Sequence, residues 1–138
     1  GVGCPFVLSS YYWCGTPKDR EAWVASAEAQ PVTEETPVLR HFDFAHITCR
    51  ATRWAAGVLW GLPEAPVDGV TLTDVRIEMD PGAEAGMAEG AYDLPAPTRR
   101  TGFLMRHARN VVFRAVTVRG AEGEPFPAGE GATPRVVE

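Results

Sequence analysis

Three stretches decide the fold: FDFAHITC at residues 42–49, VTLTDVRI at 70–77 and VVFRAVTV at 111–118. They align without gaps, and in each one the first, third, sixth and eighth residues are apolar. Alternation with a period of two predicts strands and argues against a helix, while the two intervening residues predict a bend between two short strands. A unit that cannot bury its own apolar side must stack on its copies, so the repeat predicts a solenoid of coils.

A second strand precedes the later copies of the repeat. It reads GVLW at 57–60 and GFLM at 102–105, each opened by a glycine where the backbone passes closely, and PFVL at 5–8 matches it one coil earlier. Stacked coils align their apolar side chains in internal columns, each of which buries area that one coil alone cannot. The expected columns are Phe42 with Val70 and Val111, and Phe44 with Leu72 and Phe113.

Turn and bend positions also recur from coil to coil. The residue just before each copy is His41, Gly69 or Asn110, and an Asn at such a turn bonds the backbone of the next coil. His41 is therefore interpreted as a structural residue and not a catalytic one. His46 and Asp74 share the bend position one coil apart, which predicts a hydrogen bond between them.

These features predict an all-β protein, with residues 1–126 forming coils of a parallel β-helix. Loop excursions are expected near 15–37 and 81–97, where the spacing between elements lengthens and proline is frequent. Residues 127–138 are rich in Gly, Pro and Glu, which predicts a flexible tail. A β-sandwich is the alternative architecture, but matching coils with unequal loops at fixed places favour the solenoid.

Composition excludes several classes of function. The 138 residues carry a formal charge of −5 with both signs scattered, so no basic stripe predicts a nucleic-acid partner. No apolar run approaches the roughly 20 residues that cross a bilayer, so no membrane partner is expected. The sequence has three cysteines, Cys4, Cys14 and Cys49, an odd number without the spacing of a metal site. A disulfide framework and a metal site are therefore not expected, and no cofactor is expected either. The sequence leaves the compartment open, cytoplasmic or secreted.

The chain resembles the bacterial branch of glycoside hydrolase family 28, the polygalacturonases and related pectin hydrolases, over about residues 5–126. The resemblance is carried by PFVLSSYY at 5–12, AAGVLWGLPE at 55–64, the strand repeats, and GAEGEPF at 120–126. The second stretch is the most specific, since the repeats alone fit any β-helix. The resemblance implies a right-handed, single-stranded parallel β-helix and inverting hydrolysis of bonds between galacturonic acid units.

Inverting hydrolysis needs an acid and a base whose carboxyl groups lie roughly 6.5–9.5 Å apart. The family takes them from Asn-x-Asp and Asp-Asp motifs, accompanied by Gly-His-Gly and Arg-x-Lys, and this sequence contains none of the four. The resemblance therefore implies the C-terminal portion of a hydrolase, inactive alone. Its expected partners are a pectic or galacturonate-containing glycan and upstream coils of the same polypeptide.

Four residues are the candidates for glycan binding, and no catalytic residue is assigned. The family places a tyrosine just past a strand near the cleft, and Tyr12 is the better match, with Tyr11 as the alternate. A tyrosine ring packs on a pyranose while its hydroxyl bonds a sugar oxygen, although a tyrosine that caps the coils is an equal alternative. Arg99 and Arg100 suit bidentate pairing with a galacturonate carboxylate, although solvated loop arginines are commoner.

Other interpretations compete with the hydrolase. Glu78 and Asp80 form a possible carboxylate pair past a strand, whereas Asp43 occupies an outward position that favours solvation. A non-catalytic β-helix module for glycan binding or adhesion is the alternative function, because a fold does not determine function. A third possibility is a structural stack whose open edge docks onto preceding coils.

Overall fold

The chain is all-β. The computed structural model describes residues 1–11, 26–91 and 94–138, and those ranges contain strands, turns and bends but no helix. Consequently, the described part of the chain has no helix that is long and apolar enough to cross a membrane. The strands are β1 (Val7–Ser9), β2 (Arg40–Thr52), β3 (Ala55–Trp60), β4 (Val67–Met79), β5 (Thr101–Arg106), β6 (Ala108–Arg119) and β7 (Arg135–Val137).

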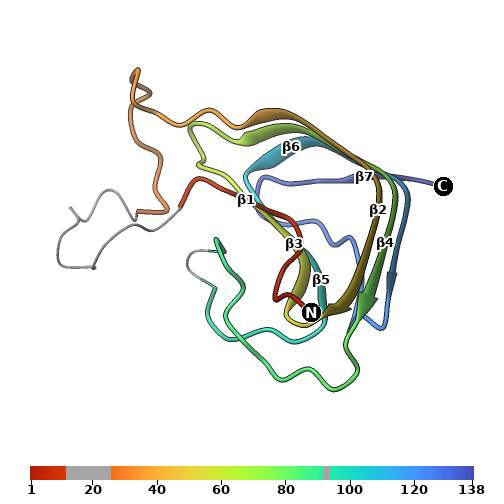
Figure 1. Ribbon diagram of the computed structural model, residues 1–138. Helices are drawn as coiled ribbons and strands as arrows, with labels where there is room; N and C mark the ends of the chain where they lie inside the picture. Colours follow the sequence, from red (N-terminus) through yellow and green to blue (C-terminus); the bar gives the residue numbers. More distant parts are fainter. Residues whose placement is uncertain (12–25, 92–93) are drawn as a thin grey trace.

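The strands form two parallel sheets, of order β1-β3-β5 and β2-β4-β6-β7. From β1 to β6 the chain visits the two sheets alternately, so each passage adds one strand to each sheet (Figure 1). Every pairing between these named strands is parallel. Since the sheets of a β-sandwich are antiparallel, this pairing differs from the alternative architecture.

The three sequence repeats lie side by side in the larger sheet without a gap. Phe42 is the partner of Val70, which in turn is the partner of Val111, and the same register continues to the eighth residue of each copy. Val70 and Leu72 in the middle copy are completely buried. The predicted alignment and its apolar columns are therefore confirmed.

The bends recur in register and are made by residues with left-handed backbone. Instead of two separate short strands, each repeat is one strand that continues through the bends. The two in-register sets are His41 (φ 63°), Gly69 (φ 75°) and Asn110 (φ 53°), and His46 (φ 57°), Asp74 (φ 50°) and Ala115 (φ 51°). Positive φ is costly for residues other than glycine, so its recurrence in every coil shows that stacking imposes the bend.

The predicted hydrogen bond between coils is confirmed at the second bend. His46 Nδ1 lies 3.0 Å from Asp74 Oδ2, and Arg76 Nη2 donates to the other oxygen of the same carboxylate at 3.1 Å. These contacts are exposed and each contributes little alone. The pKa of Asp74 is lowered, first by the His46 hydrogen bond and then by the Arg76 charge.

The smaller sheet is buried on both of its faces at β3. All six residues of β3 are buried, because the inner face meets the larger sheet and the outer face is covered by Ala88 and Ala91 of the loop that follows β4. The strand partner of Gly57 is Phe103 and not Gly102. The two glycines that open the expected strands are therefore out of register by one residue. A side chain at Gly57 would overlap the Phe103 ring, which explains the glycine.

The last residues of the chain differ from the expected flexible tail. Residues 135–137 form β7, which pairs in parallel with β6, and Ala132 is only 3% exposed. Gly129 and Ala132 exchange two backbone hydrogen bonds, and His107 N–H donates to the Glu130 carbonyl. The open edge of β6, which composition does not reveal, gives residues 135–137 a strand to pair with.

Candidate functional site

The predicted tyrosine position lies directly after β1. Tyr12 is outside the described residues. The Tyr11 hydroxyl donates to the Ser26 carbonyl at 3.1 Å, and its ring packs against the buried cluster around Trp60. Tyr11 therefore ties the chain from residue 26 onward to the end of β1, and its role in glycan binding stays a prediction.

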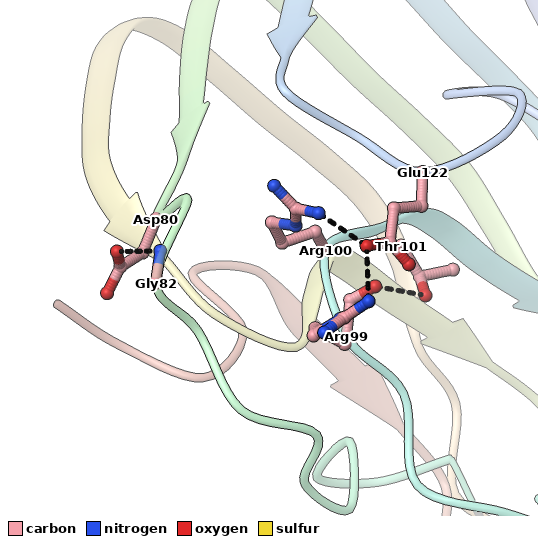
Figure 2. A network of polar contacts seen from close by, with 6 residues as sticks. All are labelled: Asp80, Gly82, Arg99, Arg100, Thr101 and Glu122. Atoms are coloured by element: carbon pink, nitrogen blue, oxygen red, sulfur yellow. Dashed lines mark hydrogen bonds and ion pairs between the residues drawn. The ribbon is translucent and has the colours of Figure 1, made fainter.

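The two predicted arginines converge on a carboxylate of their own chain. Arg99 Nη2 lies 2.9 Å and Arg100 Nη2 lies 2.5 Å from the same oxygen of Glu122, as Figure 2 shows. The Arg100 hydrogen bond is the main cause of the lowered pKa of the Glu122 carboxyl. Glu122 thus occupies the place that the sequence analysis gave to a galacturonate carboxylate.

The structure does not bring the tyrosine and arginine candidates together. Arg100 precedes β5, whose first residue, Thr101, is the partner of Ala55 at the start of β3. Tyr11 follows β1, whose last residue is the partner of Trp60 at the end of β3. Five residue steps of about 3.3 Å therefore separate the two groups, roughly 17 Å along the sheet.

A hollow of about 410 Å³ lies beside the tyrosine end of this sheet. We call it the threonine hollow. Its lining residues are Ser10, Ser26, Gln30, Pro31, Thr33, Glu35, Thr36, Pro37, Leu62 and Glu64. Its volume lies in the range of small-molecule sites, and it is formed where β1 and β3 end.

One wall of the threonine hollow is a turn held by its own hydroxyl groups. The Thr36 hydroxyl accepts from Thr33 N–H at 2.8 Å, and the Thr33 hydroxyl accepts from Glu35 N–H at 3.2 Å. Pro31 and Pro37 flank this turn and fix the backbone on either side. The wall is therefore preorganised by short-range contacts and not by a packed core.

The opposite wall is the turn that joins β3 to β4. Ala65 N–H donates to the Leu62 carbonyl at 3.2 Å, with proline at the favoured second position of the turn. Gly61 N–H donates to the Arg106 carbonyl at 2.9 Å and Val67 N–H donates to the His107 carbonyl at 3.0 Å. The next coil thus anchors both ends of the turn.

Two residues that line the threonine hollow each hold an enclosed side-chain oxygen. Ser10 Oγ and Glu64 Oε2 are shut off from solvent, and neither makes a hydrogen bond to another described residue. Leaving a buried polar group unsatisfied costs about 1–3 kcal/mol, and more when the group is charged. Sequence reasoning missed Glu64, although it lies in the 55–64 stretch that carries the resemblance.

A second hollow, of about 300 Å³, adjoins the first across the same turn. We call it the arginine hollow. Its lining residues are Val38, Leu39, Arg40, Pro63, Glu64, Ala65, Pro66, Asp68 and Arg109. Arg109 donates to Asp68 at 2.9 Å, whereas Arg40 has no ion-pair partner within the described ranges. Arg40 is therefore the cation available to an anionic ligand.

Low pH is expected to weaken the hydrogen bonds that Arg109 and Asn110 donate to Asp68 at the arginine hollow. The Asn110 and Arg109 hydrogen bonds lower the pKa of Asp68 from its ordinary 3.8. A lowered pKa adds stability above the unfolded-state value, and this contribution is lost as pH falls through the folded-state value. Asp68→Asn should therefore destabilise the protein at pH 6 and much less below pH about 3, as urea unfolding at both pH values would measure.

Asp43→Asn, on the exposed side of β2, is the matched control for this experiment. It should leave the unfolding midpoint unchanged at either pH. An Asp68→Asn effect of equal size at both pH values would contradict the electrostatic explanation.

The remaining reactive groups are already engaged or protonated. Glu78 Oε2 lies 3.9 Å from Arg50 Nε, and Asp80 accepts a hydrogen bond from Gly82 N–H at 2.9 Å (Figure 2 shows Asp80). Both carboxylates of the pair that the sequence suggested therefore interact with groups of this chain. Burial raises the pKa of the free thiols Cys4 and Cys49, which makes them poor nucleophiles. The described residues contain no group of three or more metal-ligating side chains.

Fold and site together define an all-β protein of parallel sheets, with two adjoining hollows on either side of the turn between β3 and β4. Comparisons with protein-family models, curated proteins and solved structures found no match for this chain. The hollows offer hydroxyl, carboxylate and guanidinium groups, which are the groups that bind polyhydroxylated and anionic ligands.

Proposed function

We propose that this chain forms C-terminal coils of a right-handed parallel β-helix in a polygalacturonase-like glycoside hydrolase. In this proposal the hydrolase acts on pectic glycan by inverting hydrolysis, and upstream coils supply the catalytic acids. The alternating sheets, the gap-free register and the in-register bends support the helical architecture. The resemblance of the 55–64 stretch supports the family, and the turn in this stretch separates the two hollows.

One observation carries the glycan-binding part of the proposal. Adjoining hollows of about 410 and 300 Å³ share Glu64, and the smaller one exposes the Arg40 cation, which has no ion-pair partner among the described residues. A pectic chain presents hydroxyl groups along its length and carboxylates at intervals. Each type of group has a complementary partner in one of the hollows.

The open side of the first coil supports the expected partnership with upstream coils. β2 pairs with β4 along one edge, and no strand within residues 1–11, 26–91 and 94–138 pairs with its other edge. Phe42, Phe44 and Ile47 are only partly buried, whereas their column neighbours in β4 are completely buried. A further coil, paired with β2 in the same register, would bury these side chains as β4 buries those of β6.

The test compares release of reducing ends from polygalacturonate and from rhamnogalacturonan. The 138-residue chain is compared with a chain extended upstream through coils that carry Asn-x-Asp and Asp-Asp. The proposal expects activity only in the longer chain, because inverting hydrolysis needs two carboxyl groups at the correct separation. Activity in the short chain would contradict the placement of the acids upstream.

A second function, a non-catalytic glycan-binding module, is the alternative, because a fold does not determine function and the hollows lie in a chain without the catalytic motifs. Saturable binding of polygalacturonate by a longer chain that releases no reducing ends would select this function over the hydrolase.

A further inference from the structure

We propose that the edge of β2 that faces away from β4 pairs with a strand whose outward side chains are acidic, and that it rejects basic strands, including those of a second copy of this chain. This inference rests on the proposed partnership with upstream coils and names the charge of the strand that docks. The inward columns are apolar in all three coils, whereas the charges on the outer face differ in sign from one coil to the next.

The three long strands of the larger sheet alternate in formal charge. β2 carries two arginines and one aspartate, which give +1 with histidine neutral. β4 carries three carboxylates and one arginine, which give −2, and β6 carries three arginines, which give +3. None of these charged residues is buried. Each long strand is therefore opposite in sign to the long strand beside it.

The carboxylates of β4 use this alternation to contact both neighbouring coils. Asp68 accepts a hydrogen bond from Arg109 of β6 at 2.9 Å. Glu78 Oε2 lies 3.9 Å from Arg50 Nε of β2. Opposite charges on neighbouring strands stabilise a sheet, and like charges destabilise it. An acidic strand between two basic ones is therefore the favourable order, and the same rule favours an acidic strand on the other side of β2.

Arg50 remains accessible to a further coil. Its side chain is 80% exposed, and its contact with Glu78 is long, so the guanidinium has donors left for a second carboxylate. Phe44 and Ile47, on the inward side of the same strand, are only partly buried. A strand with the pattern of β4 would cover these apolar side chains and bring carboxylates to the outer face.

A second copy of the chain is the wrong partner on charge. Within the described residues, the larger sheet ends at β2 on one side and at β6 with β7 on the other. All three strands are basic, since the one charged residue of β7 is Arg135. Pairing β2 with any of them would bring basic strands together, and like charge at an edge strand is a known protection against edge-to-edge association.

The experiment measures the binding of two fluorescent peptides to the full chain by anisotropy. One has the 13-residue sequence of β4, and the other carries Asp68→Lys, Asp74→Lys and Glu78→Lys. Both keep the apolar residues, so strand addition buries the same apolar surface. The β4 peptide should bind about tenfold more tightly at low ionic strength, because opposite charges beside β2 become like charges in the other peptide. This difference should largely vanish at about 1 M salt, where the Debye length is about 3 Å.

Two variants of the chain locate the binding edge. Arg50→Glu should remove most of the preference for the β4 peptide, and Arg119→Glu should leave it unchanged. The two are matched, because Arg119 is the strand partner of Glu78 on the β6 side and each substitution places a new carboxylate beside Glu78. Only Arg50 lies on β2, the strand to which the peptide is expected to add.

The outcomes separate this inference from the proposed function. Equal binding of the two peptides, tighter binding of the lysine peptide, binding of neither, or loss of the preference in Arg119→Glu alone would overturn the inference. So would sedimentation of the full chain as a dimer that the β4 peptide dissociates, because a second copy would then occupy the edge. In each of these cases, release of reducing ends by the upstream-extended chain would leave the proposed function standing, and its absence would overturn both.

Discussion

Replacing Phe103 by alanine is expected to lower the free energy of unfolding by about 3–5 kcal/mol. Phe103 is 0% exposed in β5, and its ring centroid lies 4.6 Å from that of Phe113 and 6.0 Å from that of Phe126. These rings pack between the two sheets. The substitution leaves a cavity there, because the hydrogen-bonded strands cannot move inward to fill it. Since domains of this size are stable by about 5–15 kcal/mol, urea unfolding should show a large shift of the midpoint.

Phe42→Ala is the control of the same size change. Phe42 belongs to an internal column but is only partly buried at the open side of β2. Its removal should cost clearly less than that of Phe103, because less apolar area is lost. Equal costs would show that the first coil is as well packed as the later ones, and would remove one support for docking of upstream coils.

The register of the larger sheet could be predicted because its signal is local and repeated. The apolar alternation of 42–49, 70–77 and 111–118 fixes which side chains face inward, and a one-residue slip would turn them all outward. The bend could be located in the same way, since two polar or small residues interrupt the alternation. Its backbone conformation could not, because Ala115 has no intrinsic preference for positive φ and yet adopts the same conformation as His46 and Asp74.

Less of the smaller sheet was accessible from the sequence. Alignment by glycine misplaced one strand by a residue, because Gly57 makes room for the Phe103 ring while Gly102 makes room for the backbone of Pro125. Two glycines that look equivalent in the sequence are thus required by different neighbouring atoms. The same difficulty applies to residues 127–138, whose composition predicts flexibility but whose strand completes the larger sheet.

The candidate site was the least predictable part. Arg99 and Arg100 have no acidic neighbour in the sequence. Their shared partner, Glu122, lies more than 20 residues later in the chain and comes close to them only in the folded coil. The threonine hollow combines residues from three separate segments, a combination that no sequence pattern reveals. The predicted tyrosine position lies next to Ser10, one of the lining residues, but none of the four predicted binding residues lines the hollow.

Gly61→Ala is expected to destabilise the chain by about 1–3 kcal/mol, because the added methyl group overpacks a site closed by backbone atoms. A Cβ atom at Gly61 would overlap the His107 carbonyl oxygen and would lie 2.6 Å from Val67 N and 3.0 Å from Pro66 Cα. All three are backbone atoms, which cannot rotate away as a side chain does. The start of the turn that separates the hollows must therefore move, and the hydrogen bond from Gly61 N–H to Arg106 is strained or lost.

Gly82→Ala tests whether this effect is specific to the turn. The nearest atom to a Cβ at Gly82 is Asp80 Oδ1 at 3.5 Å, an ordinary contact, so its cost should stay within about 0.5 kcal/mol. Urea unfolding gives the stability of both variants. A clearly larger loss for Gly61→Ala than for Gly82→Ala would show that the close passage of three backbone atoms at Gly61 sets the cost, because the two substitutions add the same methyl group. Equal losses would contradict this explanation and would mean that the turn between β3 and β4 can move aside without disturbing the hydrogen bonds that anchor it to the next coil.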